Sequence, residues 1–324
     1  MNLIIQLELN KNNKRKIFIS SIFIFLYINI ISKNKLTKID LDNQITEYEN
    51  NIDFSNFTTE IKGIALYLPQ FHEIKENNNV KKCLPLYKGH HQPRKPGDTI
   101  NYLGYYELTN GSIFKKQIEL AKSHGIYGFA FYFYWFSGKA LLEKHLMIYL
   151  NDKDINFPFL LIWANENWSR KWNGGNKEIL IKQDYKDDDP ENFIKYIKKY
   201  LIDSRYIKIN NKSVLGLYEP NKIPKLKKTI QIWRKKAIEY EIGELFILVR
   251  LNTDILNKYE LFDGAYDFPP RNGFHYKVKF KNTFIYSELL YKNINFSIND
   301  KILRDFFVFR GSMLEWDNCP RVKP

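Results

Sequence analysis

Apolar runs of strand length alternate with amphipathic stretches along most of the chain. The candidate strands begin near residues 61, 126, 158, 213, 244, 264 and 306. Apolar residues recur at helical spacing in residues 112–124, about 139–150, 190–201 and 225–240. Strands that alternate with helices pair in parallel and are joined by right-handed crossovers. The pattern therefore predicts an α/β fold.

Polar and aromatic residues follow nearly every candidate strand, which favours a barrel over an open sheet. The loops after the strands of a (β/α)8 barrel meet at one end and form its binding site. No G-x-G-x-x-G or P-loop pattern follows the first strand, as nucleotide-binding open sheets often show. We expect a (β/α)8 TIM-type barrel over residues 61–324, preceded by an N-terminal segment and linker over residues 1–60.

The segment FPFLLIWANENWSRKW, residues 157–172, carries the densest polar and aromatic chemistry. A buried strand ends at Trp163, and the polar and aromatic residues after it include Asn165, Glu166, Asn167, Trp168 and Trp172. Amides and carboxylates hydrogen-bond sugar hydroxyls, and indole faces cover the apolar face of a sugar ring. The segment predicts a carbohydrate site, although the indoles could instead fill the core.

Other candidate substrate-binding residues stand after the remaining strands. They are Gln70, His72, Tyr134, Trp135, Glu219, Arg250 and Asp317. His72 could alternatively be a satisfied core histidine, and Tyr134 a core aromatic. Five tryptophans fall at or just past strand ends, which predicts an aromatic rim: Trp135, Trp163, Trp168, Trp172 and Trp316. Such a rim is a sugar-binding feature, but a platform for nucleic-acid bases would use the same rings.

The formal charge of +14 raises the question of nucleic acid or an anionic surface as a partner. The lysines are spread along the chain and no nucleic-acid-binding signature accompanies them, so we expect a solvated surface and no nucleic acid. Cys83 and Cys319 are too far apart in sequence to suggest a disulfide framework or thiolate site, and we expect a reducing, cytoplasmic location. His90 and His91 lack a third ligand at a telling spacing. We expect neither a metal nor a cofactor.

Residues 17–32 form the only long apolar run without a charge, and basic residues flank it on both sides. The run is slightly shorter than the ~20 residues that span a bilayer. It also lacks the small-residue cleavage site of a secretory signal. A membrane anchor and a dispensable leader are both consistent with this segment.

Several longer motifs resemble the WbsX family, the glycoside hydrolase family 99-like proteins of bacterial surface-polysaccharide gene clusters. They are YLPQFH (residues 67–72), PLYKGHHQP (85–93), GYYEL (104–108), GFAFYFYWFSGKALLEK (128–144), PFLLIWANENWSRKWNG (158–174) and WDNCPR (316–321). The resemblance covers residues from about 61 to the end. It implies a (β/α)8 barrel that acts on glycans in O-antigen, capsule or related polysaccharide synthesis, as a glycosyltransferase or a glycosidase-like protein.

The chain departs from the family pattern at three places. The family segment resembling WWGKGFTEWTNV is absent, and the FPPH pattern reads Phe268, Pro269, Pro270 and Arg271 here. The family's NEWxEG motif, which carries the expected catalytic carboxylates on the last strand, does not occur before Pro324. An incomplete barrel is therefore expected, with the first and seventh candidate strands left as unpaired edges.

Glycosidic cleavage generally needs an acid and a second carboxylate opposite it. Glu166, Glu219 and Asp317 remain at strand ends, and Glu166 is the candidate catalytic residue. The alternative is that these carboxylates bind sugar on a catalytically impaired remnant or a fragment of a split gene. Glu166 could also pair with Arg170 or Arg250 as scaffolding.

Overall fold

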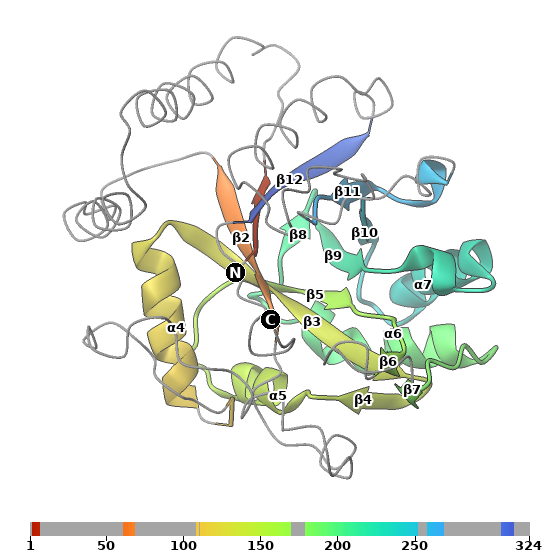
Figure 1. Ribbon diagram of the computed structural model, residues 1–324, viewed down its shortest axis with the longest axis horizontal. Helices are drawn as coiled ribbons and strands as arrows, with labels where there is room; N and C mark the ends of the chain where they lie inside the picture. The colour runs from red at the N-terminus through yellow and green to blue at the C-terminus, as the bar shows by residue number, and fades with distance from the viewer. Residues whose placement is uncertain are drawn as a thin grey trace, which may run out of the picture.

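The computed structural model describes residues 2–6, 61–68, 108–109, 111–169, 179–251, 258–268 and 306–313 (Figure 1). All seven predicted strands are present, close to their expected positions. They are β2 (Lys62–Tyr67), β3 (Ile126–Phe136), β5 (Phe159–Trp163), β9 (Lys212–Leu217), β10 (Leu245–Arg250), β11 (Gly264–Tyr266) and β12 (Phe307–Met313). Each pairs in parallel with the next, so their carboxyl ends meet at one end of the sheet.

Strand β1 (Asn2–Gln6) lies between the first and last of these parallel strands. It pairs antiparallel with β2 on one side and with β12 on the other, so the pairings run around a closed ring. The expectation of two unpaired edges was wrong, because β1 covers both edge rows of N–H and C=O groups. Within the described residues, β1 closes the ring between β12 and β2 and runs antiparallel to both.

In the described part of the chain, four α-helices cover the outside of the sheet (Figure 1). They are α4 (Gly111–Ser123), α5 (Lys144–Asn151), α6 (Asp189–Leu201) and α7 (Leu226–Glu239). Helix α6 has a proline in its first turn, Asp189 and Glu191 in the same turn, and lysines in its last turn. Proline there gives up no helical hydrogen bond, and each set of charges complements the helix dipole.

The helix expected from about residue 139 begins later than predicted. Strand β4 (Lys139–Leu141) first folds back on the end of β3 as an antiparallel hairpin. Ser137 (φ 39°) and Gly138 (φ 96°) form the left-handed turn between the two strands, which glycine adopts readily. Three short strands complete the sheets: β6 (Trp168–Ser169), β7 (Ile179–Ile181) and β8 (Lys208–Ile209). Two single turns of 3-10 helix are η2 (Pro220–Lys222) and η4 (Tyr259–Leu261).

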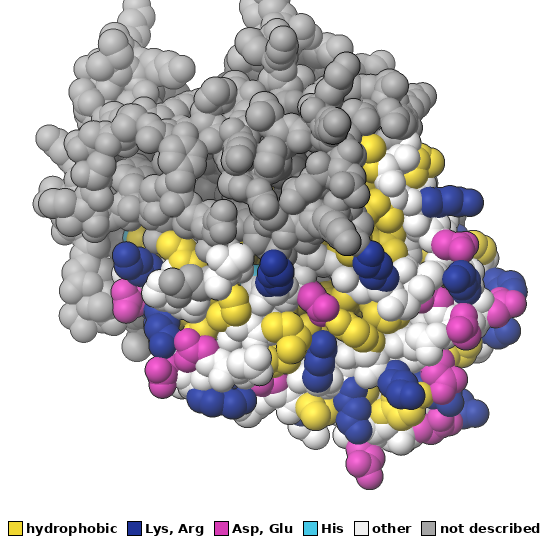
Figure 2. Space-filling view, turned by 90° about the horizontal axis from the view of Figure 1, so that it is seen from below, with side chains coloured by type: hydrophobic (Ala, Val, Ile, Leu, Met, Phe, Trp, Pro, Cys, Tyr) yellow, Lys and Arg dark blue, Asp and Glu magenta, His cyan; other side chains and the backbone are white. Residues whose placement is uncertain are grey.

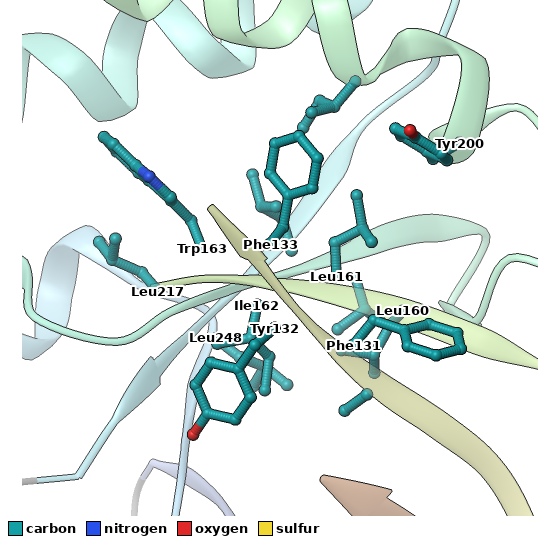
Figure 3. Packing of buried hydrophobic residues seen from close by; sticks show 14 of the residues in the cluster. Phe131, Tyr132, Phe133, Leu160, Leu161, Ile162, Trp163, Tyr200, Leu217 and Leu248 are labelled. Carbon is teal, nitrogen blue, oxygen red and sulfur yellow. The ribbon is translucent and has the colours of Figure 1, made fainter. Parts of the chain in front are cut away.

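The two faces of the sheet carry different side chains. Figure 3 shows Phe133, Leu161 and Trp163 pointing toward the helices, whereas Tyr132 and Ile162 point to the opposite face. This opposite face is the inside of the ring, because an apolar cavity there is lined by residues from many of its strands, among them Ile64, Leu160, Ile162, Val214, Gly216, Leu248, Tyr266 and Phe309. Alternation along each strand thus sends one set of residues to the helices and the other inside.

The described residues contain no helix that is long and apolar enough to cross a membrane. Residues 17–32, the candidate anchor, and the linker up to residue 60 lie outside the described residues. The expected division at residue 60 stays a prediction.

Candidate functional site

Three tyrosines and an arginine gather inside the ring toward the carboxyl ends of the parallel strands. Tyr132 belongs to β3, Tyr218 follows β9, Arg250 ends β10 and Tyr266 ends β11. The ring centroids of Tyr132 and Tyr218 are 5.8 Å apart, and the Arg250 guanidinium carbon lies 4.5 Å from the centroid of the Tyr218 ring. We call Tyr132, Tyr218, Tyr266 and Arg250 the tyrosine cluster.

Two hydroxyls of the tyrosine cluster are buried without a hydrogen-bond partner. The Tyr132 and Tyr266 side chains are only 4% and 1% exposed, and neither hydroxyl has a partner among the described residues. Burial raises the pKa of both phenols well above the usual value, so both remain O–H donors at neutral pH. A buried polar group left unpaired costs about 1–3 kcal/mol, which a ligand oxygen or a water would recover.

Arg250 forms a buried ion pair with Glu219, the residue that follows Tyr218. The Arg250 Nη2 group donates to Glu219 Oε1, and Nε donates to the Tyr218 carbonyl oxygen at 3.0 Å. The side chains of Arg250 and Glu219 are 9% and 18% exposed. The two predicted site residues are therefore brought together, and the pair fixes the loop after β9 against β10.

Asn165 joins the loop after β5 to the loop after β9. Its Nδ2 donates to the Glu219 carbonyl oxygen at 2.8 Å, and its Oδ1 accepts from the Glu219 backbone N–H at 2.8 Å. Nδ2 also donates to the Tyr185 hydroxyl at 3.0 Å, and that hydroxyl donates to the Asn165 carbonyl oxygen at 2.9 Å. Asn165 is 0% exposed, so its amide holds the two loops together rather than facing a ligand.

The next three residues of the same loop lie at or near the surface of the site. Glu166 accepts a hydrogen bond from Lys222 Nζ at 2.8 Å and its side chain is 25% exposed. Asn167 Oδ1 accepts from the backbone N–H of Gln183 at 2.6 Å. Trp168 is 7% exposed, and its ring lies 5.2 Å from that of Tyr134 in an edge-to-face arrangement. The structure thus brings together Tyr134 and Trp168, two of the predicted substrate-binding residues.

Trp163 lies apart from this group, on the helix-facing side of the sheet (Figure 3), and Trp135 packs against Phe193 of helix α6. Trp163 stacks on Phe193 of α6 at 4.8 Å, and the Trp135 Nε1 group donates to Asp189 Oδ1 at 2.8 Å. Both indoles are 2% exposed. The structure therefore differs from the expected rim for these two tryptophans, because odd-numbered residues at the ends of β3 and β5 point away from the inside.

Burial beside the Trp135–Asp189 hydrogen bond shifts the pKa of the Asp189 carboxyl. The Asp189 pKa is raised to about 6, mainly because burial disfavours the charged carboxylate, although the indole N–H opposes the shift. This carboxyl belongs to the first turn of α6, where a negative charge is otherwise favourable. Asp189 is therefore a polar group of the helix layer that could titrate under mildly acidic conditions.

Four predicted site residues lie outside the described residues: Gln70, His72, Trp172 and Asp317. Trp316 lies outside them as well. Within the described residues, no three His, Cys, Asp or Glu side chains are close enough to hold a metal ion together. Sequence reasoning missed Tyr132, Tyr266 and Gln183. The strict alternation of Phe and Tyr in residues 131–134 was a usable signal for Tyr132, since it places both tyrosines on one face.

The fold and the site together define a TIM-type α/β barrel with aromatic, amide and ion-paired side chains at the carboxyl ends of its strands. The chain belongs to the Glycosyltransferase WbsX family, whose pattern matches residues 63–324. The family resemblance seen in the sequence motifs is confirmed.

Individual relatives were also found. The chain is 33% and 32% identical over 275 residues to protein WxcX from two strains of Xanthomonas campestris pv. campestris. These alignments cover 80% of this chain and 39% of each relative, so the chain spans about two fifths of their length.

Two solved structures are similar to the chain at low sequence identity. One is a GH99 endo-alpha-mannosidase from Bacteriodes thetaiotaomicron, with 14% identity, a TM-score of 0.38, and coverage of 63% of this chain and 58% of that one. The other is a glycoside hydrolase-like protein, with 13% identity, a TM-score of 0.42, and coverage of 65% and 64%.

Proposed function

We propose that this chain acts on, or binds, glycans in the synthesis of a bacterial surface polysaccharide such as an O-antigen or a capsule. Membership of the WbsX family supports this class of function. The observation that carries the proposal is the pair of buried hydroxyls of Tyr132 and Tyr266 inside the barrel, which have no hydrogen-bond partner among the described residues. Phenol hydroxyls and aromatic faces are the groups that hold sugar rings in protein sites.

The ion pairs made by the described carboxylates favour a role in sugar binding over a role in acid catalysis. Glu166 is salt-bridged to Lys222, and Glu219 to Arg250. A general acid needs a proton to give to the leaving oxygen, whereas an ion-paired carboxylate serves as an acceptor for hydroxyl groups. A carbohydrate-binding protein without turnover is therefore the second candidate function, and the two ion pairs favour it.

Tyrosine-to-phenylalanine variants test the proposal. Tyr132→Phe and Tyr266→Phe each remove a hydroxyl that has no partner in the described part of the chain, so we expect unchanged or higher thermal stability and at least about tenfold weaker glycan binding. Tyr206→Phe is the matched control, because the buried Tyr206 hydroxyl donates to the Val214 carbonyl oxygen at 2.7 Å and accepts from the Leu161 N–H at 3.1 Å. It should lower stability and leave binding unchanged.

A panel of oligosaccharides and nucleotide-sugar donors separates the activities. Transfer to an acceptor sugar identifies a transferase, release of a reducing sugar identifies a hydrolase, and binding without turnover identifies the binding protein. Glu166→Gln should abolish turnover if Glu166 is the catalytic residue, and should only weaken binding otherwise. A wild-type chain that neither binds nor turns over any glycan would refute the proposal.

The location of the protein and its other partners follow from the same proposal. We expect a cytoplasmic protein, with residues 17–32 as a possible contact with the membrane. Deleting residues 1–33 and fractionating cells tests that contact, which would be refuted by an unchanged distribution. No nucleic acid is expected as a partner, and retention on heparin should disappear at modest salt concentrations.

A further inference from the structure

A two-stranded hairpin stands directly after the loop that carries Asn165 and Glu166. Its strands β6 and β7 pair antiparallel, with Trp168 opposite Ile181. Gln183 lies two residues beyond Ile181, and its backbone N–H donates to Asn167 Oδ1 at 2.6 Å. Because side chains alternate along extended backbone, Gln183 and Trp168 belong to the same face of the hairpin.

The polar atoms of the Gln183 and Trp168 side chains are buried and make no hydrogen bonds to the described residues. Gln183 is 6% exposed, and neither its Oε1 nor its Nε2 atom has a partner among the described residues. Trp168 is 7% exposed, and its Nε1 group is likewise unpartnered within the described part of the chain. A primary amide offers two donors and an acceptor with two lone pairs, so leaving all of them unmet is unfavourable for the free protein.

A second buried glutamine shows what a structural role looks like in this fold. Gln117 of α4 is 8% exposed, and its Oε1 accepts a hydrogen bond from the Tyr67 hydroxyl at 2.6 Å. Gln117 therefore joins a helix to strand β2, whereas the amide of Gln183 makes no such link among the described residues. The difference indicates that Gln183 serves a partner outside this part of the chain.

Two aromatic residues of β3 hold the indole of Trp168 in place. Its ring centroid lies 5.2 Å from that of Tyr134 and 5.5 Å from that of Phe136, with nearly perpendicular ring planes in both cases. These contacts to β3 fix the direction of the Nε1–H group. The hairpin and the residue that follows it thus combine a fixed aromatic ring, one indole donor and one carboxamide that has no hydrogen-bond partner among the described residues.

We propose that Gln183 and Trp168 form a sugar subsite on this hairpin. The carboxamide of Gln183 would take two neighbouring substituents of a pyranose that both donate and accept hydrogen bonds, and the Trp168 N–H would donate to a third oxygen. A vicinal diol and an acetamido group both present this chemistry. The inference rests on the proposed glycan function, and assigns to it two specific contacts.

Three variants test the subsite. Gln183→Met has nearly the same volume and no amide, Gln183→Glu keeps the acceptor without the donor, and Gln117→Met is the matched control. The probes are the methyl glycosides of glucose, galactose and mannose, together with their 2-acetamido-2-deoxy counterparts. Binding is followed by saturation-transfer NMR and titration, and unfolding is followed by circular dichroism.

Gln183→Met should weaken binding of the recognised glycosides by about tenfold or more while its thermal midpoint is unchanged or raised. Gln117→Met should lower the midpoint and leave the dissociation constant unchanged. If only the 2-acetamido glycosides lose affinity, the acetamido group is the substituent held, and an equal loss in both series identifies the diol.

Two results would overturn the subsite alone, and a third would overturn it together with the proposed function. Wild-type affinity in Gln183→Met would remove Gln183 from the site and leave the general glycan function standing. A lowered midpoint in Gln183→Met, comparable to that of Gln117→Met, would show that the amide has a structural role. Absence of glycan binding by the wild type would refute the proposed function, and the subsite with it.

Discussion

Asn165 and Glu219 exchange two hydrogen bonds, each 2.8 Å long, although 54 residues separate them in sequence. One side-chain amide thereby satisfies both the backbone N–H and the backbone C=O of the residue that pairs with Arg250. The ends of β5 and β9 are held at a fixed separation by this contact. The contact therefore joins the loop that carries Glu166 to the loop that carries Glu219.

The first prediction concerns this amide. Asn165→Ala removes the two hydrogen bonds that the Asn165 amide makes to the Glu219 N–H and C=O in a mostly buried place, so we expect a loss of about 2–3 kcal/mol in the free energy of unfolding. Asn192→Ala is the control: Asn192 is exposed and bonds only Asp188 Oδ2 among the described residues, at 3.0 Å. Its effect should stay below about 0.5 kcal/mol. Urea denaturation of both variants measures the difference, and equal losses would contradict the role of Asn165.

The ion pair of Arg250 and Glu219 should be costly to break from one side. Arg250→Met leaves Glu219 with no counter-charge from Arg250 in a mostly buried place, and we expect a loss of about 3 kcal/mol. The double variant Arg250→Met/Glu219→Gln should recover part of this loss, because no charge is then left in the pair. Lys225→Met removes an exposed pair with Asp187 and should cost less than about 1 kcal/mol. Additive effects in the double variant would show that the two residues do not interact.

The raised pKa of Asp189 predicts that the stability of the protein depends on pH. Its pKa in the folded protein, about 6, lies above the ordinary value of 3.8. The folded state therefore holds the Asp189 proton more tightly than the unfolded state does. The stability that this proton contributes is complete below about pH 4 and is lost as the pH rises through about 6. Asp189→Asn can still accept the Trp135 hydrogen bond but does not titrate.

The difference between the Asp189→Asn and wild-type unfolding free energies, followed from pH 3.5 to pH 7.5, measures this contribution. It should change in favour of the variant by about 1 kcal/mol as the pH rises, after allowance for screening by water. Parallel curves for the two proteins would show that Asp189 titrates normally in the folded state.

At Gly128, β3 lies so close to the residue preceding β5 that a larger side chain does not fit. A Cβ atom at this position would lie 2.6 Å from the Pro158 carbonyl oxygen, a backbone atom that cannot move aside alone. Gly128→Ala should therefore destabilise the protein by about 1–3 kcal/mol. Thermal unfolding measures the loss, and a midpoint equal to that of the wild type would show that the two strands can separate without cost.

The seven parallel strands could be predicted because each apolar run is bounded by residues that end strands. Strand β3 occupies Ile126–Phe136, as its aromatic run indicated, between Gly125 with φ 71° and the left-handed turn at Ser137. Strand β1 was not predicted, since five residues far from the barrel sequence carry no local sign of their partners. Its location depends on which edges remain free after the other strands have paired.

The site was predicted less completely than the fold. Among the residues selected by their position at strand ends, Tyr134 lies near Trp168 and Glu219 lies near Arg250. Strand position alone did not assign a face, so Trp135 was grouped with Tyr134 although the two point in opposite directions. The role of Asn165 depends on a partner in another loop, which residue type and local spacing do not reveal.

Closure by β1 has a consequence for the order of events during synthesis. Residues 2–5 pair with residues 310–313, so roughly 300 residues must emerge from the ribosome before this seam can form. The nascent chain must keep its first strand unpaired with β12 throughout that interval. Contacts between such distant segments carry a large loop-closure cost and form slowly, which makes the seam a late step in maturation and the first place where a trapped chain would misassemble.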